Sequence, residues 1–167
     1  ANKDLETYAE NAPLLEAAFE NLHESEQNAY AKWATENLTE SDLVFSPTAC
    51  SMSMSELFIH IYDLAFISNS VFGGQSVKKD DVKSPEAYRE LTLELIKDLS
   101  DRLKQMGDDE LAQCELSTKK GAEFPFWFML NGPIADALTH VGQITSWRRM
   151  NGNPQPKGVN VFLGTKN

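Results

Sequence analysis

The chain has 167 residues, of which 41% are hydrophobic and 10% aromatic, a length and composition that predict one domain with no need of a disulfide or structural metal. Its formal net charge of −10 argues against nucleic-acid binding, which relies on clustered lysine and arginine. The absence of any run of about 18 apolar residues argues against a membrane span.

The N-terminal stretch ANKDLETYAENAP has neither a basic nor an apolar signal region, so we expect a cytoplasmic protein. Cys50 and Cys114 stand outside any metal-binding spacing and fit a reducing compartment as free thiols.

The first helix is expected at roughly 12–37, because apolar residues recur at steps of three and four between acidic ones. Its apolar stripe is Leu15, Ala18, Phe19, Leu22, Ala29, Tyr30 and Trp33. A loop, TESDLVFSPTAC, follows. The second helix is expected at roughly 53–72, since Ser53 and Glu56 have capping-box spacing and two glycines stand at its end.

A third helix is expected from Ser84-Pro85-Glu86 to near Gly107, and the polar, acidic segment after it indicates a surface crossover or flap. The last helix begins near Pro125 or Pro133 and ends at Arg148-Arg149, before a glycine and a proline. We interpret the arginine pair as a solvated helix end or a helix-dipole partner. Four long helices without strand periodicity predict an all-α four-helix bundle.

Asp136, His140 and Gln143 share one face of the last helix, within a mostly apolar segment that we expect to be buried. His60 is one of few polar residues in the second helix. Together His60, Asp136 and His140 predict an open divalent-metal site with two histidines and one carboxylate. The same spacing also fits an ordinary hydrogen-bonded His-Asp pair in the core.

Other residues are also candidates for the site. Asp63, one turn after His60, is either a neighbour that orients the imidazole, even a fourth ligand, or a surface aspartate. His23 is most simply an exposed histidine. Gln143 favours a structural hydrogen bond over coordination. Phe126 and Trp127 belong either to the core or to the wall of a pocket for a cofactor or substrate.

Two segments, LTESDLVFSPTACSMSMSELFIHIYDL and ADALTHVGQITSWRRMNGNP, resemble the DinB/YfiT-like family of metal-binding proteins, and the similarity extends over roughly residues 12 to 156. The resemblance implies an up-down-down-up four-helix bundle, often a homodimer, with a divalent metal held by three histidines. His60 and His140 match two of them, whereas Asp136 stands where the family has the third.

The resemblance also implies a function. Characterised members include thiol-dependent transferases and isomerases that use a low-molecular-weight thiol such as bacillithiol or mycothiol. We therefore expect a thiol S-transferase acting on a small molecule, with Zn, Ni, Fe or Mn as the metal and hydrolysis as a less favoured reaction. The alternative is a non-catalytic, stress-associated binding bundle in which Asp136 marks a vacated site.

Overall fold

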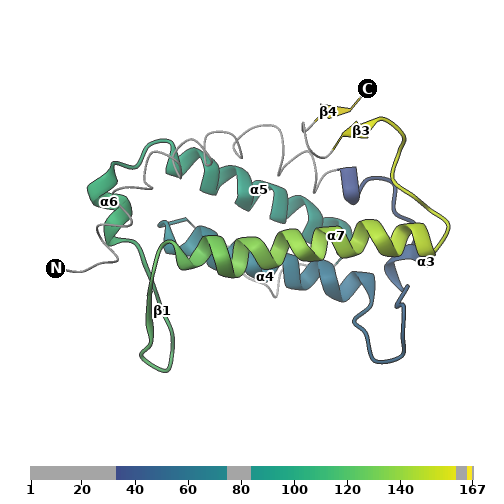
Figure 1. Cartoon of the computed structure of the whole chain (residues 1–167), viewed down its shortest axis with the longest axis horizontal. Helices are drawn as coiled ribbons and strands as arrows, with labels where there is room; N and C mark the ends of the chain where they lie inside the picture. Colours follow the sequence, from purple (N-terminus) through teal and green to yellow (C-terminus); the bar gives the residue numbers. More distant parts are fainter. Residues whose placement is uncertain (1–32, 75–83, 161–164, 167) are drawn as a thin grey trace.

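The computed structural model describes residues 33–74, 84–160 and 165–166, and three long helices dominate this part of the chain (Figure 1). They are α4 (Met54–Val71), α5 (Pro85–Leu103) and α7 (Ala135–Met150). Helix α4 packs against both of the others. Following the sequence colours in Figure 1, α4 and α5 run in one direction and α7 returns in the opposite one. The described part is therefore mainly helical, as predicted.

The local signals placed the ends of α4 and α5 to within a few residues. Ser53 caps α4 through the predicted capping box with Glu56, and Gly73 has the positive φ of 76° that ends a helix. Ser84 caps α5 by accepting a hydrogen bond from the backbone of Ala87. Helix α5 ends at Leu103, four residues before the predicted end.

Most of the predicted first helix lies outside the described residues. Its end is described: Trp33 and Ala34 are helical, and Asn37 has a left-handed φ of 57°, a conformation that asparagine tolerates well. The following segment, predicted as a loop, contains a short helix, α3 (Glu40–Leu43), with a capping box between Thr39 and Asp42. The local pattern Thr-x-x-Asp is typical of such a helix start.

The predicted crossover folds into a short helix, α6 (Asp108–Gln113), and an antiparallel hairpin of β1 (Glu115–Ser117) and β2 (Glu123–Pro125). A second pair of very short strands, β3 (Val159–Asn160) and β4 (Thr165–Lys166), lies near the C-terminus. The all-α prediction did not anticipate these two pairs, because both are too short to produce a recognisable alternation of polar and apolar residues.

Two starts were predicted for the last helix, near Pro125 or near Pro133, and the structure agrees with the second. A π-helical turn, η3 (Leu130–Ile134), contains Pro133 and is kinked at Gly132, and α7 begins only after it. Proline lacks the backbone hydrogen-bond donor that a straight helix needs, which explains the interruption. The kink sets the direction in which the first turn of α7 points its side chains.

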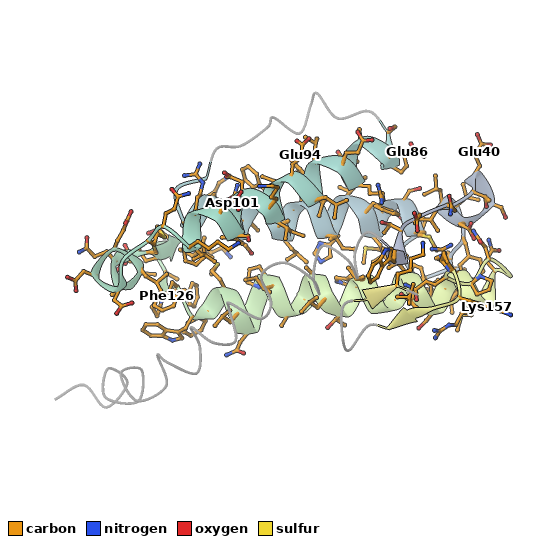
Figure 2. The ribbon with its side chains drawn as sticks, turned by 90° about the horizontal axis from the view of Figure 1, so that it is seen from above. Glu40, Glu86, Glu94, Asp101, Phe126 and Lys157 are labelled. Carbon is orange, nitrogen blue, oxygen red and sulfur yellow. The ribbon has the colours of Figure 1, made fainter. Side chains whose placement is uncertain are left out.

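The core has two parts. The larger cluster lies between α4, α5 and α7, and its fully buried members include Met54, Leu57 and Ile144. A smaller cluster at the other end joins Phe72 and Leu99 with Phe126 and Met129. Figure 2 shows Phe126 at the α6 end of the molecule and Glu40 at the opposite end.

Candidate metal centre

Helices α4 and α7 bring His60, Asp136 and His140 together. The Oδ2 atom of Asp136 lies 3.5 Å from Nε2 of His60, and its Oδ1 atom lies 3.3 Å from Nε2 of His140. The two imidazole rings meet edge to face, with centroids 4.7 Å apart. Each residue offers one ligand atom, and these atoms all lie within 4.8 Å of one another. The structure thus assembles the predicted set of residues.

The separations are compatible with a shared cation as well as with direct ion pairs. Both distances exceed the range of about 2.7–3.2 Å for an N–H···O hydrogen bond. Around a tetrahedral cation with ligand bonds of about 2.0–2.1 Å, neighbouring ligand atoms are about 3.3 Å apart. The Asp136 oxygens already stand at nearly this distance from both imidazole nitrogens. The residues therefore fit a divalent metal in ligand type, and their ligand atoms lie within 4.8 Å of one another.

Gln143 determines which nitrogen of His140 is available. Its amide oxygen Oε1 lies 2.7 Å from Nδ1 of His140. An amide oxygen can only accept a hydrogen bond, so Nδ1 carries the hydrogen, and in the neutral imidazole Nε2, on the side of Asp136, is the nitrogen with the lone pair. Partners of this kind orient metal-binding histidines in known metal sites. The predicted structural role of Gln143 fits this contact.

The site is open to solvent, and the prediction that this segment is buried is wrong for Asp136. Its side chain is 47% exposed, that of His60 is 39% exposed and that of His140 is 12% exposed. Asp136 lies in the first turn of α7, which begins shortly after the kink at Gly132. Val141 and Ile144, further along the same helix, are buried, and such apolar residues are why the sequence suggested burial.

The other predicted site residues lie elsewhere. Asp63 is half-buried on α4 and is not part of the cluster that the described residues form. His23 lies outside the described residues. Phe126 is only 1% exposed and packs in the smaller core cluster, which agrees with its interpretation as a core residue. The rings of Trp127 and Phe126 meet edge to face, with centroids 5.5 Å apart. The role of Trp127 in a pocket stays a prediction.

A buried polar network at the other end of α7 was missed by the sequence analysis. Arg148 is 1% exposed, so its interpretation as a solvated helix end is wrong, whereas Arg149 is exposed. The Arg148 guanidinium donates to the carbonyls of Trp33 (3.3 Å), Ala34 (2.9 Å) and Asn153 (3.0 Å). It therefore ties the start of the described chain to the end of α7.

Asp42 forms the other half of this network. Its buried carboxylate accepts hydrogen bonds from the side-chain amides of Asn151 at 2.8 Å and Asn153 at 2.6 Å, and from Thr39. Burial by itself raises the pKa of Asp42, but these donors outweigh it and lower the pKa to about 2. The Asn-Gly-Asn run after α7, which we interpreted only as a helix stop, could have signalled such a network.

A scan against protein-family models found no match, and neither did a search of curated proteins. Among the described helices, none combines the length and the apolar character that crossing a membrane requires.

Proposed function

We propose that this protein is a divalent-metal-dependent enzyme whose metal is held by His60, Asp136 and His140. The observation that carries the proposal is the convergence of three ligand atoms from two helices within 4.8 Å, with a neighbouring amide that bonds Nδ1 of His140 and leaves Nε2 on the side of the cluster. Two histidines and one carboxylate leave coordination positions open, which is typical of catalytic rather than structural sites.

Residues of the chain account both for metal binding and for the access of a substrate to the metal. Gln143 holds the His140 ring in one tautomer, and the two imidazoles present their Nε2 atoms to the same space. The exposed side of Asp136 leaves that space open to a substrate. A divalent cation bound there supplies Lewis-acid chemistry that lowers the pKa of a coordinated thiol or water. The donor set suits Zn, Ni, Fe or Mn.

Thiol S-transfer is the reaction we propose. The resemblance to the DinB/YfiT-like family supports it, with a low-molecular-weight thiol such as bacillithiol or mycothiol as the co-substrate. In this reaction the thiol loses its proton, its sulfur forms a bond to an electrophilic carbon, and the leaving group departs with the bonding electrons. The same resemblance supports two further parts of the proposal, an up-down-down-up four-helix fold and a homodimer. The sequence supports a cytoplasmic location.

Metal content tests the site directly. Tag-free protein is measured by plasma mass spectrometry after reconstitution with each of the four metals, beside Asp136→Ala and His140→Ala variants. Asp63→Ala is the matched control, since Asp63 lies outside the cluster. We expect about one ion per chain in the parent and the control and a loss in both site variants, because each removes a ligand. Failure of every metal to bind the parent protein would refute the metal site.

Activity is tested separately. Metal-loaded protein is assayed for conjugation of a thiol to chlorodinitrobenzene, and His60→Ala is expected to abolish any rate above the uncatalysed one. Metal binding without thiol transfer would contradict the reaction while leaving the site in place.

A non-catalytic binding bundle is the second candidate function. The observation that favours it is Asp136 itself, which stands between two imidazoles where the resembled family has a histidine. A carboxylate can pair with protonated histidines without any metal. Protein that stays metal-free after reconstitution, with unchanged stability in a chelator, would favour this alternative.

A further inference from the structure

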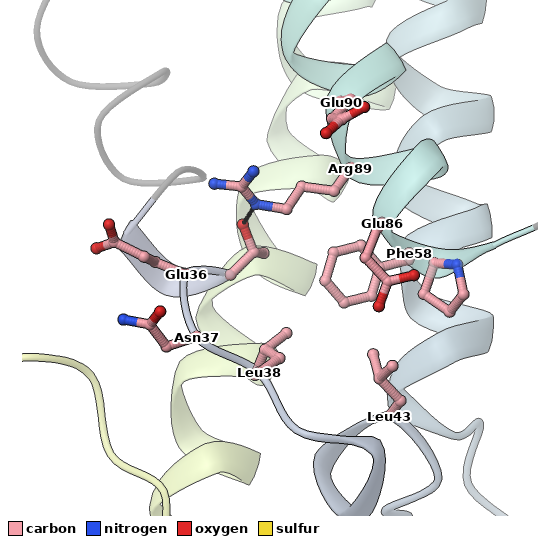
Figure 3. Close-up of a pocket in the computed structure, with 10 residues that line it drawn as sticks. Glu36, Asn37, Leu38, Leu43, Phe58, Glu86, Arg89 and Glu90 are labelled. Carbon is pink, nitrogen blue, oxygen red and sulfur yellow. Dashed lines mark hydrogen bonds between the residues drawn. The ribbon is translucent and has the colours of Figure 1, made fainter.

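A pocket of about 340 Å³ lies between the segment that leads into α3 and the start of α5. Figure 3 shows its lining side chains, which come from residues 35–38, from α3 and α4, and from the first two turns of α5. Its volume falls in the range of about 300–1,000 Å³ that is usual for small-molecule sites. None of the three residues of the candidate metal centre lines it. The pocket is therefore a separate candidate site.

One part of the pocket wall is apolar. Phe58 on α4 is 4% exposed and belongs to the larger core cluster, against which Leu38 and Leu43 also pack. Pro85, at the start of α5, adds a further apolar surface. A ligand with an apolar body would cover these side chains, and the removal of that surface from water would favour binding.

The opposite character comes from α5. Glu86 and Glu90 line the pocket one helical turn apart, and both are exposed. Neither carboxylate makes a hydrogen bond or an ion pair with any residue in the described part of the chain. Two like charges four residues apart on a helix repel each other. A positively charged group in the pocket would relieve this repulsion.

The two other charged residues of the lining have partners. Glu36 accepts from Nζ of Lys166 at 2.9 Å. The Nε atom of Arg89 donates to the hydroxyl of Thr35 at 2.8 Å, the dashed line in Figure 3. If Lys166 is taken to balance Glu36, two carboxylates still face one guanidinium. The lining is therefore negative, and the net charge of −10 on the whole chain acts in the same direction.

We propose that this pocket binds a small organic cation, specifically a primary amine with an aliphatic or aromatic body. The body covers Phe58, Leu38 and Leu43, and the ammonium group lies beside Glu86 and Glu90. Exposed ion pairs contribute little free energy, so the apolar contacts supply most of the affinity and the carboxylates supply the preference for positive charge. The proposal goes beyond the proposed function and does not depend on the metal.

Titration of the isotope-labelled full chain with three probes tests the proposal by NMR. Phenethylamine, phenethyl alcohol and phenylpropionate carry the same ring and differ in charge. The backbone amide shifts report both the dissociation constant and the place of binding. At low ionic strength we expect the amine to bind about fivefold more tightly than the alcohol, and the anion to bind most weakly. The largest shifts are expected around Leu38, Phe58 and Arg89.

Charge-removing variants test the role of the two carboxylates. Glu86→Gln combined with Glu90→Gln keeps the size of both side chains, and we expect the preference for the amine over the alcohol to fall to about twofold or less. Glu94→Gln is the matched control, since Glu94 is exposed one turn further along α5 and does not line the pocket. This control should keep the preference of the parent protein.

Several outcomes would overturn the proposal. The first is that the parent protein binds no amine, or binds the amine and the alcohol equally well. The second is a preference for the amine that survives unchanged in the double variant. The third is a set of amine-induced shifts confined to the surroundings of His60 and Asp136, which would mean that the amine binds at the candidate metal centre instead of the pocket.

Discussion

The Nδ1 atom of His140 lies 2.7 Å from the amide oxygen of Gln143, one turn further along α7. This contact connects the candidate metal centre to a residue that does not need to touch the metal. It fixes the tautomer of His140, so that the ring offers Nε2 to the same space as His60 and Asp136.

Replacing Gln143 with leucine is expected to weaken metal binding about 10–100-fold, because the His140 ring loses the acceptor that orients it. Gln143→Glu keeps an acceptor at the same place and is expected to retain the affinity. Competition with a chromophoric chelator measures both constants. Equal affinity in the leucine variant and the parent would show that the contact does not position the ring.

The lowered pKa of Asp42 leads us to expect a loss of folding stability in acid. Its pKa in the folded protein is about 2, below the ordinary value of 3.8. A depressed carboxyl pKa adds stability that is present above the unfolded pKa and is lost as the pH falls through the folded one. We expect about 2 kcal/mol of unfolding free energy to disappear between about pH 4 and 2.

Urea unfolding at a series of pH values checks this expectation. Asp42→Asn should be less stable at neutral pH and should show a flatter pH dependence over that window. Glu40→Gln, an exposed position in the same short helix, is the control and should keep the parent's slope. A slope unchanged in Asp42→Asn would contradict the assignment.

Arg148→Met is expected to destabilise the fold by about 3 kcal/mol, because the carbonyls of Trp33, Ala34 and Asn153 lose a buried donor. Its exposed neighbour is the control, since Arg149→Met should change stability by no more than about 0.5 kcal/mol. Chemical denaturation measures both. Equal effects of the two substitutions would mean that the buried network contributes little.

Phe126→Ala is expected to cost about 3–5 kcal/mol of stability, because the side chain is buried against Phe72 and Met129. Metal affinity should be unchanged, since the smaller cluster is separate from the histidines. Phe128→Ala, at a position 46% exposed, should be close to neutral. A loss of metal binding in Phe126→Ala at temperatures where the protein stays folded would contradict this separation.

Local sequence patterns predicted the ends of α4 and the start of α5, where the controlling interactions are local. The capping box at Ser53, the cap at Ser84 and the glycine after α4 all act within one turn, and the structure confirms each of them. The short helix at Thr39 was missed although its capping pattern is equally local.

The sequence by itself determined that Asp136, His140 and Gln143 share a helix face, because residues three and four apart are neighbours on any α-helix. Only the tertiary structure decided that His60 joins them, since that depends on how α4 and α7 pack. It also decided that Asp136 is exposed and Arg148 buried. Asp136 lies at the start of α7, just after the kink at Gly132, and Arg148 is buried where it meets carbonyls more than a hundred residues away in the chain, and neither arrangement can be read from local sequence.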